Sequence, residues 1–331
     1  MPVLHLLYES ALRFSAGRLT RSTLVRARYG HRGREVEAQT RWAVTIDYGG
    51  RVFRSALLAC VSGTMLCASV SAQTATGAAP LVIGETFTVV SDVLGEARTI
   101  NVYRPPLYGD TTEVQLPVLY MPDGGLGEDF LHIAGLLQVS VMNGTMRPFL
   151  LVGIENTERR RDLTGPTAVA QDRAIAPRVG GSAAFRRFIR TELMPSVNAR
   201  YRTTGETGIM GESLAGLFVV ETFLVEPDLF NTYIAFDPSL WWNDQQLINE
   251  AGHRLRSGQY AHRTFYLASS REEQIAVVAR RLADALEAES PNGLSWQFHA
   301  MPDESHATIF HPAALAAFRR LFRPSQTDAM R

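Results

Sequence analysis

The sequence predicts an α/β fold with a mostly parallel central sheet and helices on both faces. Short apolar runs of strand length, such as VLYMP at 118–122, suit strands that are buried on both faces of a parallel sheet. Segments with apolar residues at helical spacing separate these runs. Because strands that alternate with helices build a covered parallel sheet, we expect a single domain over residues 83–325.

Turn residues and changes of periodicity give the element boundaries. Two strands are expected at 85–91 and 98–104, and the second of them ends at Pro105-Pro106. Further strands are expected at 118–122, 149–156, 207–212, 232–238, 264–270 and 294–302. Helices are expected at 182–201, 214–226, 271–288 and 312–322, the first with a kink at Pro195.

Overall composition limits the possible partners. The 331 residues carry 33 basic and 33 acidic side chains, and this zero net charge indicates no nucleic-acid partner. A hydrophobic content of 46% is typical of a globular protein. The sequence leaves the oligomeric state open.

The N-terminal part of the chain has the layout of an export signal. Residues 1–50 are rich in arginine and lack sustained periodicity, so we expect a non-structural leader that reflects a misassigned start codon. Residues 51–72 combine two arginines, an uncharged apolar stretch and a small-residue cleavage site that ends at Ala72, as in a secretory signal peptide. The stretch is short for a membrane span, which needs about 20 apolar residues. We therefore expect a periplasmic or secreted protein with a flexible tether at 73–82 and no stable membrane anchor.

Both cysteines of the chain, Cys60 and Cys67, lie within the predicted signal peptide. After cleavage the protein would have neither a cysteine nucleophile nor a thiolate metal site. We expect no metal and no cofactor.

Ser213 is the candidate nucleophile. It lies in the stretch G-E-S-L-A-G between a predicted strand and a predicted helix. A strand–serine–helix turn with small flanking residues is the nucleophile elbow of α/β-hydrolases, although Ala215 stands where the usual G-x-S-x-G pattern has its last glycine. The alternative is that Ser213 merely caps the helix.

A nucleophilic serine needs a histidine base and an acid that orients the base. In the sequence of an α/β-hydrolase the serine comes first, the acid second and the histidine last. His306 lies in a polar loop after the last predicted strand and is the expected base. His132 precedes the serine in the chain, and the remaining histidines of residues 73–331 suit structural positions better: His253, His262, His299 and His311. For the acid we favour Glu272, in the loop after the strand expected at 264–270. Glu273 and Asp237 stay open as alternatives, because a glutamate in the first turn of a helix is also explained by its favourable interaction with the helix dipole.

The oxyanion formed in acyl transfer needs backbone N–H donors. One is expected from Leu214, directly after the nucleophile. The other is expected from Gly124 or Gly125, in the turn after the strand at 118–122.

Several blocks together resemble the putative-esterase family of α/β-hydrolases, which includes esterase D and the enterochelin and other siderophore esterases. The resemblance covers most of residues 83–323. It is carried by VGIENTERRRDLTGP, by FRRFIRTELMPSVNARYRT followed by GESLAGLF, and by DPSLWWN and ESHAT. It implies a serine hydrolase with Ser213 as nucleophile, His306 as base and Glu272 as acid.

The same resemblance suggests where substrate binds. Trp241 and Trp242 would form a wall of the acyl pocket, and Arg161 is a further candidate for substrate binding. Asp237 replaces a serine of the family pattern beside these tryptophans. An extra carboxylate there would disfavour anionic substrates.

We therefore expect an exported carboxylic-ester hydrolase that acts through an acyl-enzyme. Its partner would be a small-molecule ester, such as a siderophore, sugar, feruloyl or short acyl ester. An acyltransferase with the same triad and a non-catalytic binding protein of the same fold are the alternatives.

Overall fold

The computed structural model of the protein describes residues 78–106 and 114–324. The predicted leader at 1–50 and the predicted signal peptide at 51–72 lie outside the described residues. The predicted tether is described only from residue 78 onward, where it is exposed and forms neither helix nor strand. Within the described ranges, no helix is long and apolar enough to span a bilayer.

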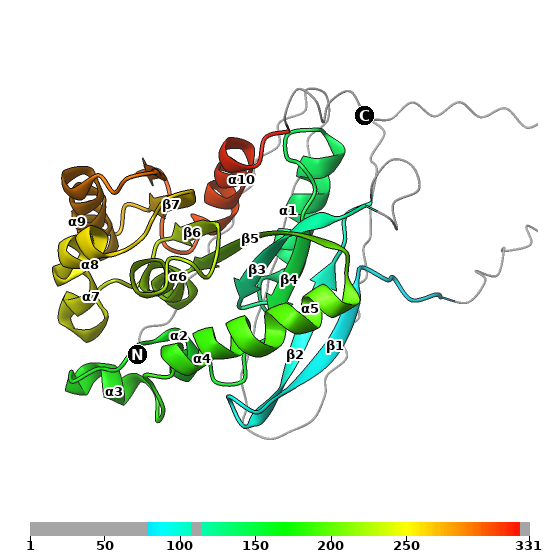
Figure 1. The fold of residues 1–331 in the computed structure, drawn as a ribbon, viewed down its shortest axis with the longest axis horizontal. Helices are drawn as coiled ribbons and strands as arrows, with labels where there is room; N and C mark the ends of the chain where they lie inside the picture. The colour runs from blue at the N-terminus through cyan, green and yellow to red at the C-terminus, as the bar shows by residue number, and fades with distance from the viewer. Residues whose placement is uncertain (1–77, 107–113, 325–331) are drawn as a thin grey trace, which may run out of the picture. The chain divides into compact units, whose positions relative to one another are not determined.

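The described part of the chain builds an eight-stranded sheet (Figure 1). Its strands in chain order are β1 (Glu85–Ser91), β2 (Glu96–Tyr103), β3 (Leu116–Pro122), β4 (Leu150–Ile154), β5 (Thr203–Glu212), β6 (Thr232–Phe236), β7 (Arg263–Ser269) and β8 (Leu294–Ala300). The strand order is β1-β2-β4-β3-β5-β6-β7-β8. The pairs β1–β2 and β2–β4 are antiparallel and all the others are parallel, which confirms the predicted mostly parallel sheet.

Helices cover both faces of this sheet. They are α1 (Phe130–Met142), α2 (Arg159–Leu163), α3 (Ala170–Ile175), α4 (Ser182–Phe188), the π-helical η1 (Ile189–Leu193), α5 (Met194–Arg200), α6 (Leu214–Val225), the 3₁₀-helical η2 (Trp242–Gln245), α7 (Gln246–Asn249), α8 (Ala251–Ser257), α9 (Glu273–Glu289) and α10 (Phe310–Leu321). Side chains of α1 and α10 share one apolar cluster, and those of α4, η1, α5, α6, α8 and α9 share another.

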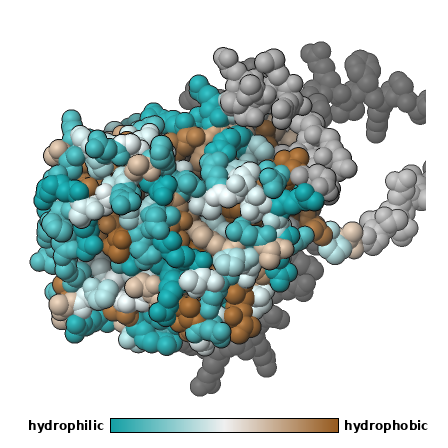
Figure 2. All heavy atoms as spheres, viewed as in Figure 1, coloured by the Kyte–Doolittle hydropathy of each residue, from teal (hydrophilic) through white to brown (hydrophobic). Residues whose placement is uncertain are grey.

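Successive side chains of a strand enter different clusters. On β3, Val118 and Tyr120 belong to the cluster of α6, whereas Leu119 and Met121 belong to the cluster of α1 and α10. Because side chains alternate across a strand, both faces of β3 are buried. Most of the large apolar side chains are buried between the sheet and its helices. Hydrophilic residues cover much of the face seen in Figure 2.

The helix expected at 182–201 is interrupted rather than simply kinked. It runs as α4, the π turn η1 and α5, with η1 ending two residues before Pro195. Proline lacks an N–H and its ring clashes with the carbonyl four residues back. The wider π turn provides the local change of geometry that such a residue requires.

Candidate active site

Ser213 lies on a strained turn between β5 and α6. Its backbone angles are φ 59° and ψ −118°, a combination that non-glycine residues rarely adopt. The Ser213 side chain makes no capping hydrogen bond to α6. The turn is therefore the expected elbow, which presents the hydroxyl at the carboxyl edge of the sheet, and the helix-cap alternative is not supported.

Small residues let α6 lie close to the strands at this turn. A Cβ added to Gly211 would lie 2.6 Å from the Ala215 carbonyl carbon and 2.7 Å from its Cβ. A Cβ added to Gly216 would lie 2.9 Å from the Phe236 carbonyl oxygen. The methyl group of Ala215, where the usual pattern has glycine, is accommodated because Gly211 opposite it has no side chain.

Replacing Gly216 with alanine is expected to destabilise the protein by about 1–3 kcal/mol, because the new methyl group must displace backbone atoms. Urea unfolding would measure the loss. Gly135→Ala on α1 is the matched control: a Cβ there meets nothing within 4 Å, and alanine favours a helix by about 1 kcal/mol. Equal stability of the two variants would contradict this account of the elbow.

His306 links the serine to a carboxylate. Its Nε2 lies 3.1 Å from Ser213 Oγ, and its Nδ1 lies 3.0 Å from Asp237 Oδ2. The hydrogen bond to Asp237 is the main reason why the pKa of His306 is raised above its ordinary value of 6.5. The geometry suits a proton on Nδ1 and a lone pair on Nε2 that faces the serine hydroxyl.

The structure places Asp237, and not the favoured Glu272 or the alternative Glu273, in contact with His306. Asp237 follows β6, has φ 43° and is fully buried, and its Oδ1 accepts the N–H of Ser270 at 2.6 Å. Glu272 is the N-cap residue of α9 and Glu273 is its first residue, and both are exposed. The expectation for Glu272 is therefore corrected: its charge acts on His306 only from a distance.

Glu212 is a site residue that the sequence analysis missed. It is the last residue of β5, and its Oε1 lies 3.3 Å from His306 Nδ1. Burial raises the pKa of Glu212 to about 7. Its position directly before the candidate nucleophile, at the carboxyl edge of the sheet, was the signal that could have identified it.

Not all of the expected oxyanion donors have a backbone N–H that is available to bind an oxyanion. Leu214 is the first residue of α6, where a helix N–H has no acceptor within the helix. Gly124 donates its N–H to the Ile154 carbonyl at 3.0 Å, because pairing between β3 and β4 continues past the end of β3, and this corrects its expected role. Gly125 donates to the Glu128 carboxylate at 2.7 Å, so an oxyanion would have to displace that acceptor.

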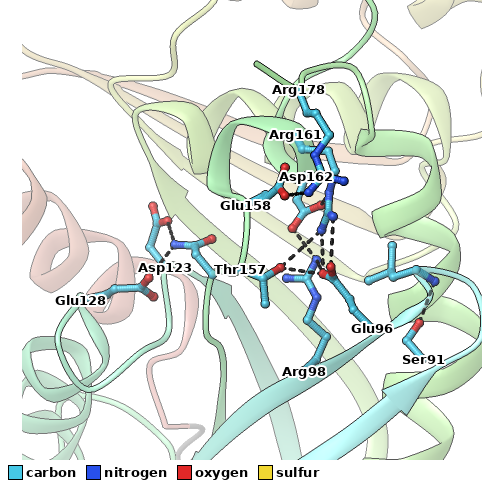
Figure 3. A network of polar contacts seen from close by, with 12 residues as sticks. Ser91, Glu96, Arg98, Asp123, Glu128, Thr157, Glu158, Arg161, Asp162 and Arg178 are labelled. Carbon is cyan, nitrogen blue, oxygen red and sulfur yellow. Dashed lines mark hydrogen bonds and ion pairs between the residues drawn. The ribbon is translucent and has the colours of Figure 1, made fainter. Parts of the chain in front are cut away.

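An aspartate at the end of β3 anchors the neighbouring loops. Asp123, with φ 58°, accepts two hydrogen bonds of 2.7 Å from Arg159. Asn156 bridges Asp123 and Glu128, at 2.6 and 2.8 Å, and Figure 3 shows these two acids in the same region of the site. The arrangement holds Arg159 near Glu212. The positive charge of Arg159 lowers the pKa of Glu212, but burial raises that pKa by more.

A buried ion-pair network fixes α2 on β2 (Figure 3). Arg98 on β2 is fully buried and pairs with Asp162 on α2 and, at 2.8 Å, with Glu96. Arg161 donates to the same two carboxylates, at 2.6 Å to Glu96 and 2.7 Å to Asp162. The hydrogen bond from Arg161 holds the pKa of Glu96 at about 2, below the ordinary 4.5. Ionised Glu96 therefore stabilises the folded protein fully above pH 4.5, and this contribution is lost as the pH falls through 2.

The structure corrects the expected substrate contacts of Arg161 and Asp237, whereas the acyl-pocket role of Trp241 and Trp242 stays a prediction. Arg161 is engaged by two carboxylates, and the fully buried Asp237 is bonded to His306. Trp242 is buried, donates to the Gly165 carbonyl at 2.9 Å and lines a cavity of about 230 Å³ beside α6. The ring of Trp241 packs on Trp242 with its centroid 6.1 Å away.

A different cavity, of about 400 Å³, adjoins the candidate catalytic residues. Its lining residues are Asp129, His132, Glu212, His306, Ala307, Thr308, Phe310 and His311. His132 on α1 and His311 on α10 are in contact in its lining, with His132 Nε2 2.9 Å from His311 Nδ1. Among the described residues, no group of three or more histidine, cysteine or acidic side chains could hold a metal ion.

A strained strand–serine–helix turn at the carboxyl edge of a mostly parallel sheet defines the class of the α/β-hydrolases. Within that class, the sequence profile of the putative esterase family matches residues 91–297. The chain belongs to this family, which confirms the resemblance found in the sequence, and the protein is an esterase.

Two curated relatives have siderophore esterase names. Ferri-bacillibactin esterase BesA of Bacillus subtilis (strain 168) is 31% identical over 197 residues, which span 54% of this chain and 68% of that protein. The siderophore triacetylfusarinine C esterase of Aspergillus fumigatus is 30% identical over 202 residues, which span 55% of this chain and 65% of that protein. The crystal structure of an IroE-like serine hydrolase from Shewanella oneidensis matches with a TM-score of 0.66 at 28% identity, over 72% of this chain and 80% of that chain.

Proposed function

We propose that the protein hydrolyses ester bonds of a siderophore through an acyl-enzyme, with Ser213 as nucleophile, His306 as general base and Asp237 as the orienting acid. The observation that carries this proposal is the continuous contact from Ser213 Oγ to His306 Nε2 and from His306 Nδ1 to Asp237 Oδ2, at 3.1 and 3.0 Å.

The first half of the reaction forms the acyl-enzyme. Ser213 Oγ attacks the ester carbonyl carbon while its proton passes to His306 Nε2. The tetrahedral oxyanion is stabilised by the Leu214 N–H. When the intermediate collapses, the C–O bond to the alcohol breaks, and the leaving oxygen takes the proton from His306.

In the second half, a water molecule attacks the acyl carbonyl, and its proton passes to His306 Nε2. Collapse of this intermediate releases the carboxylic acid and returns the proton to Ser213 Oγ. Asp237 stabilises the imidazolium that forms in both halves. The Ser270 N–H donates to the other oxygen of Asp237 and fixes the orientation of the buried side chain.

The siderophore assignment comes from the relatives, which are named as esterases of bacillibactin and triacetylfusarinine C. A hydrolysis screen over four substrate classes tests it: siderophore, sugar, feruloyl and short acyl esters. We expect the largest kcat/KM for an ester of a siderophore. A larger value for any of the other three classes would contradict the substrate assignment while leaving the esterase chemistry in place.

We further propose that the protein is exported, because residues 51–72 have the layout of a signal peptide. The mature protein is expected to begin at Gln73, within a few residues. N-terminal sequencing of protein from the periplasm or the medium would show this start. An intact N-terminus on protein confined to the cytoplasm would contradict export.

A further inference from the structure

Two carboxylates converge on one nitrogen of His306. Asp237 Oδ2 lies 3.0 Å from Nδ1, and Glu212 Oε1 lies 3.3 Å from the same atom. The two acids come from neighbouring strands, because Glu212 pairs with Phe236, the residue before Asp237. A triad needs one acceptor for the Nδ1 proton, so the second carboxylate requires an explanation.

Glu212 is not a surface acid that happens to lie nearby. Its side chain is 18% exposed, and burial raises its pKa to about 7, which keeps it near half ionisation at neutral pH. Charged and titratable groups from several elements face Glu212 and His306 or share their cavity: Asp123, Asp129, His132, Arg159, Asp237, Glu272 and His311. Among the groups that act on Glu212, Arg159 and a protonated His306 favour its ionised form, whereas Asp123 and Asp237 oppose it.

We infer that Glu212 is a positioning residue for His306 that shares the Nδ1 proton with Asp237. This inference rests on the proposed function of Ser213 and His306. Ionised Glu212 adds a second negative charge beside the imidazolium that forms in each half-reaction, and it offers a second acceptor that keeps the proton on Nδ1. With this second acceptor, the His306 ring keeps the orientation that catalysis needs even when the acceptor at position 237 is weakened, as in Asp237→Asn.

The first consequence is a shift of the pH profile. Negative charge near an imidazole favours its protonated form, so Glu212 contributes to the raised pKa of His306. Because the base must be neutral to accept a proton, kcat/KM falls as the pH drops through that pKa. In Glu212→Gln the midpoint of this acid limb is expected to move to lower pH by about 1 unit.

The second consequence is strong coupling between the two acids. With Asp237 present, Glu212→Gln is expected to lower kcat by only about threefold, since Asp237 still holds the Nδ1 proton. In the Asp237→Asn background, where Glu212 is the remaining carboxylate on Nδ1, the same change is expected to lower kcat by at least about 30-fold, because members of one network are not additive.

Hydrolysis of 4-nitrophenyl acetate by the full chain, from pH 5 to 9, measures both consequences in the parent enzyme, the two single variants and the double variant. Glu287→Gln, an exposed glutamate of α9, is the matched control and should leave the profile unchanged. An unshifted acid limb in Glu212→Gln, together with equal losses in the two backgrounds, would overturn the role of Glu212. Asp237→Asn keeps a side-chain oxygen that can accept the Ser270 N–H, so it is expected to fold. If it does not fold, the acid limb of the pH profile of Glu212→Gln alone decides the role of Glu212.

The same assay separates this inference from the proposed function. If Ser213→Ala hydrolyses the ester as fast as the parent enzyme, the proposed function fails and the role of Glu212 fails with it. If Ser213→Ala is inactive but the two acids show neither coupling nor a pH shift, only the role of Glu212 fails.

Discussion

Ser213→Ala is expected to lower kcat for ester hydrolysis by at least about 10³-fold while leaving the protein folded. The loss follows from removal of the only oxygen that His306 Nε2 could activate at 3.1 Å within the described residues. The stability change should stay within about 1 kcal/mol, because the Ser213 side chain makes no capping bond to α6. His306→Ala should lose a similar factor, since nucleophile and base act as one unit.

A neighbouring hydroxyl provides the matched control for this prediction. Ser239 Oγ lies 3.4 Å from Ser213 Oγ and has no contact with His306 among the described interactions. Ser239→Ala should therefore keep kcat within about tenfold of the parent enzyme. Turnover of 4-nitrophenyl acetate and urea unfolding of all three variants measure the two quantities.

The acid is decided by comparing two further variants with the same substrate. Asp237→Asn is expected to lower kcat by more than about 10²-fold, whereas Glu272→Gln should lower it less than about threefold. The reason is the 3.0 Å contact of the buried Asp237 with His306, against an exposed position for Glu272. A larger loss in Glu272→Gln would restore the sequence-based preference and contradict the structural assignment.

Asp162→Ala is expected to destabilise the protein by about 3–5 kcal/mol, because it leaves the buried Arg98 guanidinium with a less buried partner, Glu96. The free energy of unfolding in urea measures this loss. The double variant Arg98→Met with Asp162→Leu should recover much of it, since a buried ion pair can be replaced by apolar side chains at little cost.

Arg178→Ala is the control for the Asp162 prediction. Arg178 pairs with Glu158 at the surface, with 63% of its side chain exposed, so the change should stay within about 1 kcal/mol. An Asp162→Ala variant as stable as Arg178→Ala would show that the buried network does not hold α2 on the sheet.

Most of the sheet could be predicted because its strands are short apolar runs bounded by turn residues. The strand expected at 85–91 matches β1 (Glu85–Ser91) in both boundaries. Helix α1 was missed, because its sequence FLHIAGLLQVSVM is apolar around most of its circumference and contains Gly135. Periodicity cannot distinguish such a segment from a buried strand.

The candidate acid could not be predicted from chain position alone. Asp237 and Glu272 follow the neighbouring strands β6 and β7, whose ends lie about 4.8 Å apart at one edge of the sheet. What separates them is the φ of 43° at Asp237 and the acceptor role of its side chain for Ser270, both of which arise from tertiary packing. The amide of Gly124 was misjudged for the same reason, since the sequence does not reveal how far β3–β4 pairing extends.

Mapping of a fluorophosphonate adduct by peptide mass spectrometry tests the central claim most directly, because such a probe bonds covalently to an activated serine oxygen. We predict one adduct, on Ser213, which is absent from Ser213→Ala and forms far more slowly in His306→Ala. An adduct on another residue, or undiminished labelling of His306→Ala, would contradict the assignment of Ser213 and His306 as nucleophile and base.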